Sequence, residues 1–205
     1  MSETIYDVMI PEEIKNCTLP SPEELEYWKL AKNRVFTITD EICENCIELA
    51  KTIIRMNVEE INIPKEELKP IQIWIHTPGG DLDAALALCD VIETSRIPII
   101  TVCMGMAMSA GFLILLAGHN RYAFTHNQLL IHSGSASFAG TAEQMSSFQE
   151  NYKKMLDMMK RYILERTTIN ERTFNKYKTR DWYVNCEDVE KYGIAKVIKS
   201  FDEIK

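Results

Sequence analysis

The stretch IQIWIHTPGGDLDAALALCDVIET, residues 71–94, decides the fold. Isoleucine alternates with other residues from Ile71 to Ile75, which is the pattern of a buried strand. Thr77, Pro78 and two glycines interrupt this pattern, and apolar residues then recur at helical spacing from Leu82 to Thr94. A strand, a tight glycine turn and a helix predict an α/β protein built on a parallel sheet.

The same order of strand and helix recurs on both sides of this stretch, so we expect a mainly parallel sheet with right-handed crossovers. Upstream, the sequence predicts a β-rich run from Val35 to Thr37 and then a helix that Asp40 caps, with apolar positions at Ile42, Cys46, Leu49, Ile53 and Ile54. Downstream it predicts a strand Ile99–Cys103, a helix Ser109–Ala117, strands near Tyr122 and Leu129, a helix from Thr141 to about Arg166, helices Glu171–Lys176 and Cys186–Tyr192, and a strand near Val197.

Composition narrows the function classes. The 205 residues carry a formal net charge of −7 and no long basic run, which argues against nucleic-acid binding. The longest apolar stretch, residues 107–118, is too short to span a bilayer, and neither a secretory signal nor a transit peptide is visible, so a cytoplasmic protein is expected. Residues 1–30 read as a terminal arm with a weak helix from Pro22 to Leu30, and residues 31–205 as one domain.

Six cysteines are present, and without an export signal we expect them to be reduced and mostly buried. Cys43 and Cys46 form a C-x-x-C, but it lies in a helical pattern without a second pair or a nearby histidine. We therefore predict no metal site and no cofactor.

Three residues form a candidate catalytic set. Ser109 follows an apolar strand at the start of a small-residue helix, His132 ends the strand Gln128–Ile131, and Asp181 lies in the sequence Thr179 to Tyr183. A hydroxyl needs a base near neutral pKa and a carboxylate that orients the base before it can act as a nucleophile. Taken alone, Ser109 is better read as a helix cap than as a nucleophile.

Around these residues the chain resembles the proteolytic subunits of the Clp protease family (ClpP). The resemblance covers roughly residues 27–198 and rests on four segments: the turn Thr77 to Gly80, the box Cys103 to Ser109, Ile131-His132, and Arg180 to Tyr183. The separation of Gly80 from Ser109 also matches the family.

The resemblance implies a ClpP/crotonase-like fold, a spiral of ββα units with a strand-helix handle extension at about residues 133–166. It implies that Ser109, His132 and Asp181 act as a triad and that the backbone N–H groups of Gly80 and Ala110 form an oxyanion hole. The implied assembly is a homo-oligomer of stacked heptameric rings that degrades unfolded polypeptides supplied by an AAA+ unfoldase of the ClpX, ClpA or ClpC type. The 205 residues contain no G-x-x-x-x-G-K-[ST] loop, so we expect the ATPase to be a separate chain.

Several positions depart from the family pattern. Ser133-Gly134 stands where the family usually has Gln-Pro, Ala110 replaces a Met, and Thr179 replaces an acidic residue that helps ring pairing. His76 replaces an Asn and has either an electrostatic effect on the site or a structural role at a strand end. Two alternatives stay open: a catalytically weak or inactive ring subunit, and an acyl-CoA enzyme of the crotonase type.

Overall fold

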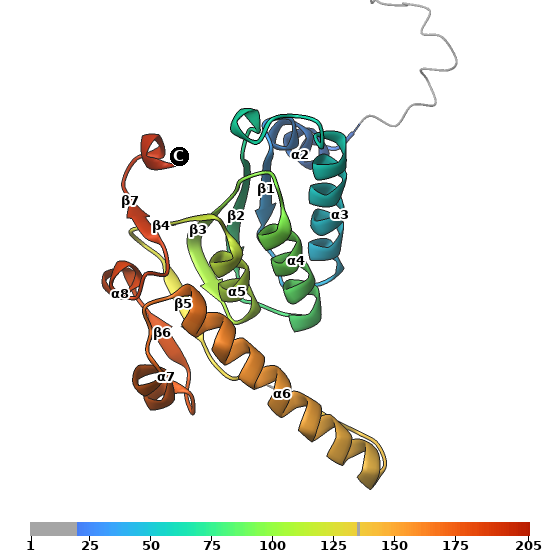
Figure 1. The fold of residues 1–205 in the computed structure, drawn as a ribbon, viewed down its shortest axis with the longest axis vertical. Helices are drawn as coiled ribbons and strands as arrows, with labels where there is room; N and C mark the ends of the chain where they lie inside the picture. Colours follow the sequence, from blue (N-terminus) through green and yellow to red (C-terminus); the bar gives the residue numbers. More distant parts are fainter. Residues whose placement is uncertain (1–19, 135) are drawn as a thin grey trace, which may run out of the picture. The chain divides into compact units, whose positions relative to one another are not determined.

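A computed structural model describes residues 20–134 and 136–205 of the chain (Figure 1). Most of the expected terminal arm and Ser135 lie outside these residues. The elements in order are α2 (Pro22–Lys32), β1 (Val35–Ile38), α3 (Glu44–Glu59), η1 (Lys65–Glu67), β2 (Ile71–Thr77), α4 (Leu82–Thr94), β3 (Ile99–Met108), α5 (Ala110–Ala117), β4 (Asn120–Phe124), β5 (Gln128–Ile131), α6 (Ala142–Arg166), α7 (Glu171–Tyr177), β6 (Trp182–Val184), α8 (Cys186–Lys191), β7 (Lys196–Ile198) and η2 (Phe201–Glu203).

The chain divides into two units, Met1–Asn33 and Arg34–Lys205. The described part of the first unit is helix α2, which confirms and extends the weak helix expected there. Ser21 and Glu24 form a capping box at its start, and none of its residues is buried. All the remaining elements belong to the second unit.

A seven-stranded sheet forms the centre of the second unit, in the order β1-β2-β3-β4-β7, with β5 paired to β3 and β6 paired to β5. Every pair is parallel except β5 with β6, so the predicted α/β fold with a mainly parallel sheet is confirmed. Strand β6 was not expected. It follows Asp181 directly and pairs Trp182 with Ile131, the last residue of β5.

Apolar side chains from the predicted strands and helices form the core. Ile71, Ile73 and Ile75 are buried while the residues between them are only partly so, as the alternation in β2 predicts. All eight residues of α5 are buried. Burial of apolar surface stabilises the folded state by roughly 25 cal/mol per Å². The complete burial of α5 therefore holds this helix against the sheet, and it also holds Ser109, the residue that precedes it.

The start of α3 differs from the prediction. Asp40 does not cap it, and the N-cap is Cys43. The reason is tertiary pairing: the N–H of Ile42 donates to the carbonyl of Gly79 at 2.8 Å, and the N–H of Asp81 donates to the carbonyl of Ile42 at 2.9 Å. Ile42 is thereby held in an extended bridge and excluded from the helix. Ile54, expected on the apolar face, is 50% exposed, so that expectation is also wrong.

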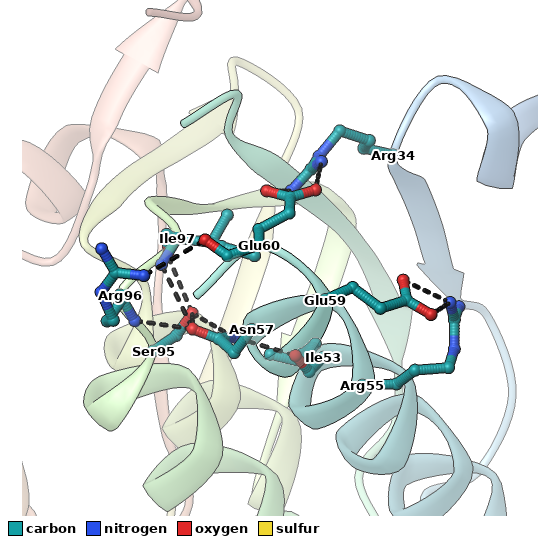
Figure 2. A network of polar contacts seen from close by, with 9 residues as sticks. All are labelled: Arg34, Ile53, Arg55, Asn57, Glu59, Glu60, Ser95, Arg96 and Ile97. Carbon is teal, nitrogen blue, oxygen red and sulfur yellow. Dashed lines mark hydrogen bonds and ion pairs between the residues drawn. The ribbon is translucent and has the colours of Figure 1, made fainter. Parts of the chain in front are cut away.

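A polar network fastens the end of α3 to the amino ends of two strands (Figure 2). The side chain of Asn57 donates to Ser95 Oγ at 2.9 Å and accepts from the N–H of Arg96 at 2.8 Å. The guanidinium of Arg34, just before β1, pairs with Glu60. These contacts join β1, α3 and the loop before β3 at the amino-terminal ends of the parallel strands.

Helix α6 confirms the predicted long helix, and it begins with a capping box in which Thr141 and Gln144 bond reciprocally. It extends away from the sheet (Figure 1). Ile163 is its one buried residue. Among residues 20–134 and 136–205, no helix is both long enough and apolar enough to cross a membrane.

Candidate active site

Ser109 lies between β3 and α5 in an unusual backbone conformation. Its φ of 54° and ψ of −121° fall in a region that residues with a side chain rarely occupy. Its N–H donates to the carbonyl of Leu130 at 2.9 Å, which ties it to β5. The hydroxyl makes no capping bond to α5. Ser109 therefore takes the N-cap position of α5, but its side chain does not cap the helix. Such backbone strain is characteristic of functional positions.

The hydroxyl of Ser109 faces His132 instead. Nε2 of His132 lies 2.7 Å from Ser109 Oγ. The two residues reach each other because β3 and β5 are parallel neighbours, with Met108 opposite Leu130, and both strands end at the same edge. When the proton of the neutral imidazole is on Nδ1, Nε2 accepts from the serine hydroxyl, which is the arrangement that general-base activation requires.

Asp181 lies on the other side of the imidazole. Its Oδ1 is 3.6 Å from His132 Nδ1, which is longer than a hydrogen bond, and its side chain is 58% exposed. The hydroxyl of Ser133 donates to the carbonyl of Lys178 at 2.8 Å, and the carbonyl of Ser133 accepts from Tyr152 at 2.7 Å. Ser133, the residue after His132, is thus bonded both to helix α6 and to the loop that leads to Asp181.

The glycine turn lies directly against Ser109. A Cβ on Gly79, whose φ is 106°, would lie 2.7 Å from the Cβ of Ser109 and 2.8 Å from the carbonyl oxygen of Met108. Only glycine allows both this conformation and this approach. Gly80, with a φ of 144°, packs in the same way against the backbone of Ile42. Each glycine is therefore required by a different neighbour.

Thr77, the last residue of β2, stabilises the glycine turn through hydrogen bonds of its side chain. Its side chain is fully buried, donates to the carbonyl of Asp40 at 2.5 Å and accepts from the N–H of Gly79 at 3.2 Å. Ala110, the other expected oxyanion donor, is the first residue of α5, so its N–H has no partner within the helix. The amino end of a helix also favours negative charge.

A pocket of about 250 Å³ opens beside His132. Apolar side chains from β5, α6, α7 and β6 form most of its wall: Ile131, Leu156, Met159, Ile163, Phe174, Tyr177 and Trp182. Lys160, Lys178 and Asp157 add charge at its lining. Its size and apolar lining suit one substrate side chain next to the reacting bond.

Among residues 20–134 and 136–205, the cysteines form no second site. Cys46, Cys89 and Cys103 are buried, and burial raises the pKa of the Cys46 thiol to about 11 and those of Cys89 and Cys103 to about 12. In the part of the chain that the structure describes, no three His, Cys, Asp or Glu side chains gather as metal ligands.

The structure therefore brings together all three predicted site residues and the glycine turn. The contact of Gly79 with Ser109, the bonds of Thr77 and those of Ser133 were missed, because they depend on how separate turns meet in space. The only signal for the first of them was the doubled glycine itself.

Comparisons with known proteins point the same way. A family model described as Clp protease matches residues 24–201. The chain is 30% identical over 198 residues to the ATP-dependent Clp protease proteolytic subunit 2 of Treponema denticola, and the aligned region covers 94% of each chain. It is 32% identical over 182 residues to the subunit of the same name from Chlamydia trachomatis, 87% of each chain. A Deinococcus radiodurans proteolytic subunit is 28% identical over 171 residues, 82% of this chain and 81% of that one.

Proposed function

The chain belongs to the Clp protease family, and on that premise we propose that it is a serine endopeptidase in which Ser109 is the nucleophile, His132 the general base and Asp181 the residue that orients the base. The observation that carries the proposal is the 2.7 Å contact between His132 Nε2 and Ser109 Oγ. It occurs at a serine whose backbone is strained and whose hydroxyl makes no capping bond to its own helix.

The proposed reaction has two stages. His132 takes the proton of Ser109 as Oγ attacks the scissile carbonyl, and the oxyanion is held by the N–H groups of Gly80 and Ala110. The tetrahedral intermediate then collapses and the scissile C–N bond breaks. His132 gives its proton to the leaving amine, and an acyl-enzyme ester with Ser109 remains. Water, deprotonated by His132, then attacks the ester and releases the acyl product with Ser109 restored.

Asp181 has a supporting role in this scheme. A carboxylate near Nδ1 favours the tautomer with its proton on Nδ1 and stabilises the imidazolium that forms. The 3.6 Å separation and the exposure of Asp181 mean that the carboxylate must move inward for a direct hydrogen bond. We propose that this movement accompanies assembly or substrate binding.

The family also suggests how the chain works in the cell. We propose a homo-oligomer of stacked heptameric rings in the cytoplasm, with residues 133–166 as the handle and an AAA+ unfoldase supplying unfolded polypeptide. The relatives' names describe them as ATP-dependent proteolytic subunits. The 25-residue helix α6 with one buried residue supports a role in contacts between subunits, because it covers little of its own chain.

Labelling with a fluorophosphonate probe tests the proposal. The purified, assembled chain should be labelled at Ser109, and Ser109→Ala should abolish both labelling and cleavage of a fluorogenic peptide. Ser147→Ala is the matched control, since within the described part of the chain that exposed hydroxyl bonds only to the carbonyl of Glu143 in its own helix. A large assembly that neither labels nor cleaves would favour the inactive ring subunit, and thioester turnover without peptide cleavage would favour the crotonase-type enzyme.

A further inference from the structure

Strand β3 changes its neighbour halfway along its length. Ile100 to Cys103 pair with β4, whereas Met106 to Met108 pair with β5. On its other side, β2 pairs Ile75 with Cys103 and Thr77 with Ala107. One residue of β2, His76, therefore faces three residues of β3. This irregularity is a β-bulge, and it lies where β3 exchanges one partner for the other.

His76 fills the bulge. Its Nδ1 lies 2.7 Å from the carbonyl oxygen of Met104. Because a carbonyl only accepts, Nδ1 carries the proton and donates. Gly105 has a φ of 100°, and a Cβ there would lie 3.0 Å from Nδ1 of His76 and 3.2 Å from its Cε1. The imidazole thus packs against the one residue of the bulge that needs a left-handed backbone.

The bulge sets the position of the proposed nucleophile. The half of β3 beyond it ends at Met108 and leads directly into Ser109, whose N–H donates to the carbonyl of Leu130 on β5. His132 follows the end of that same strand. A change in the register of β3 at Met104–Gly105 would therefore move the hydroxyl of Ser109 relative to the imidazole of His132, and a shift of about 1 Å at a reacting atom costs up to about 100-fold in rate.

We propose that His76 is a positioning residue for the peptidase reaction. Its hydrogen bond to Met104 holds the bulge in the form that aligns Ser109 with His132. The inference rests on the proposed function, because it concerns the same two reacting groups. It assigns His76 the structural role at a strand end and makes that role necessary for the rate of catalysis.

The donor N–H is what distinguishes this role from simple space filling. Leucine at position 76 would occupy similar volume without donating, whereas asparagine can donate through its amide. His119, which lies just before β4, provides a matched control because its imidazole also bonds to the backbone of β3. Its Nδ1 accepts from the N–H of Ile99 at 2.9 Å, at the end of β3 farthest in sequence from Ser109.

The test compares His76→Leu, His76→Asn and His119→Leu in the assembled full chain, measuring kcat, KM, the rate of fluorophosphonate labelling and the assembly mass. We expect His76→Leu to lower kcat and the labelling rate by about 10- to 100-fold with KM little changed. His76→Asn should restore most of the rate, and His119→Leu should match the wild type.

Two results would overturn the inference while leaving the proposed function intact: an unchanged kcat in His76→Leu, or an equal loss in His119→Leu. If the wild type itself fails to label, the proposed function is overturned and the inference falls with it. Should His76→Leu fail to assemble, Gly105→Ala tests the bulge from the β3 side. Wild-type kcat in an assembled Gly105→Ala variant would contradict the inference.

Discussion

Gly79 and Ser109 are thirty positions apart in the sequence, yet the Cβ that Gly79 lacks would overlap the Cβ of Ser109, at 2.7 Å. The glycine turn is therefore one wall of the candidate site. Gly79→Ala should abolish peptidase activity, because the methyl group would displace Ser109 or the turn and because a φ of 106° strains any residue with a Cβ. Peptide cleavage and fluorophosphonate labelling measure the loss.

Gly193→Ala is the control for this substitution. Gly193 also has a positive φ, 62°, but its nearest neighbours belong to Thr168. The control variant should lose stability to urea while its assembled form keeps wild-type kcat. If Gly79→Ala retained kcat, the turn would not be a wall of the site.

Ser133 is predicted to keep the loop before Asp181 in place. Ser133→Ala removes the bond to the carbonyl of Lys178 and should lower kcat by about 2- to 10-fold, the equivalent of one ordinary hydrogen bond acting on the alignment of Asp181. The variant is compared with Ser147→Ala in a peptidase assay at equal assembly mass. Equal activity in the two variants would show that Ser133 has no part in alignment.

Much of this fold is predictable from local patterns, but the site only in part. The alternation of β2 and the periodicity of α4 depend on residues close in sequence, so both elements are confirmed. Aspartate is a good capping residue, which favours a helix start at Asp40, but the pairing of Ile42 with the glycine turn outweighs that preference. Ser109 and His132 could be paired through a family resemblance. The bulge at Met104 could not be predicted from the sequence, because it exists only through the register of three strands.

The buried thiols should resist alkylation. At pH 8, iodoacetamide should modify exposed Cys43 rapidly, while Cys46, Cys89 and Cys103 should react only after unfolding in urea, since burial raises their pKa and blocks the reagent. Peptide mass mapping reads out each site. Cys43→Ser should remove the rapid reaction of the peptide that carries position 43, and fast labelling of Cys89 in the native protein would contradict the described burial.

The same thiols predict loss of stability in alkali. Burial raises the pKa of Cys89 from its ordinary value of 9.0 to about 12. The unfolded chain then loses this proton at lower pH than the folded chain, so the stabilising effect is complete below pH 9 and disappears as the pH rises to about 12. The free energy of unfolding, from urea titrations at fixed protein concentration, should fall across that range. A constant value would refute the linkage.

Arg166 is predicted to anchor the carboxyl end of α6. Its Nε donates to Glu93 on α4 at 2.7 Å, its guanidinium lies 3.8 Å from the ring centre of Tyr162, and both ionic side chains are 26% exposed. Arg166→Ala should lower the free energy of unfolding by about 1 to 2 kcal/mol, a figure reduced for partial exposure. Lys154→Ala, which breaks an exposed pair with Glu150 on the same helix, should leave it unchanged.

The pocket beside His132 predicts which substrates are cleaved fastest. Because most of its lining is apolar and its volume is about 250 Å³, peptides with a large apolar side chain next to the scissile bond should react with higher kcat/KM than those with glycine or an acidic residue there. Leu156 projects into this space from α6. Leu156→Trp would fill much of the space and should lower kcat/KM for the large apolar peptide by at least about tenfold.

Two comparisons make this result specific. Peptides with glycine at the same position do not need the pocket, so Leu156→Trp should change their kcat/KM by less than about twofold. Arg161→Trp, an equally large change at an exposed position of the same helix, should leave both substrates unaffected. If Leu156→Trp slowed both peptides equally, the substitution would act by disturbing His132, and the pocket would not select the substrate side chain.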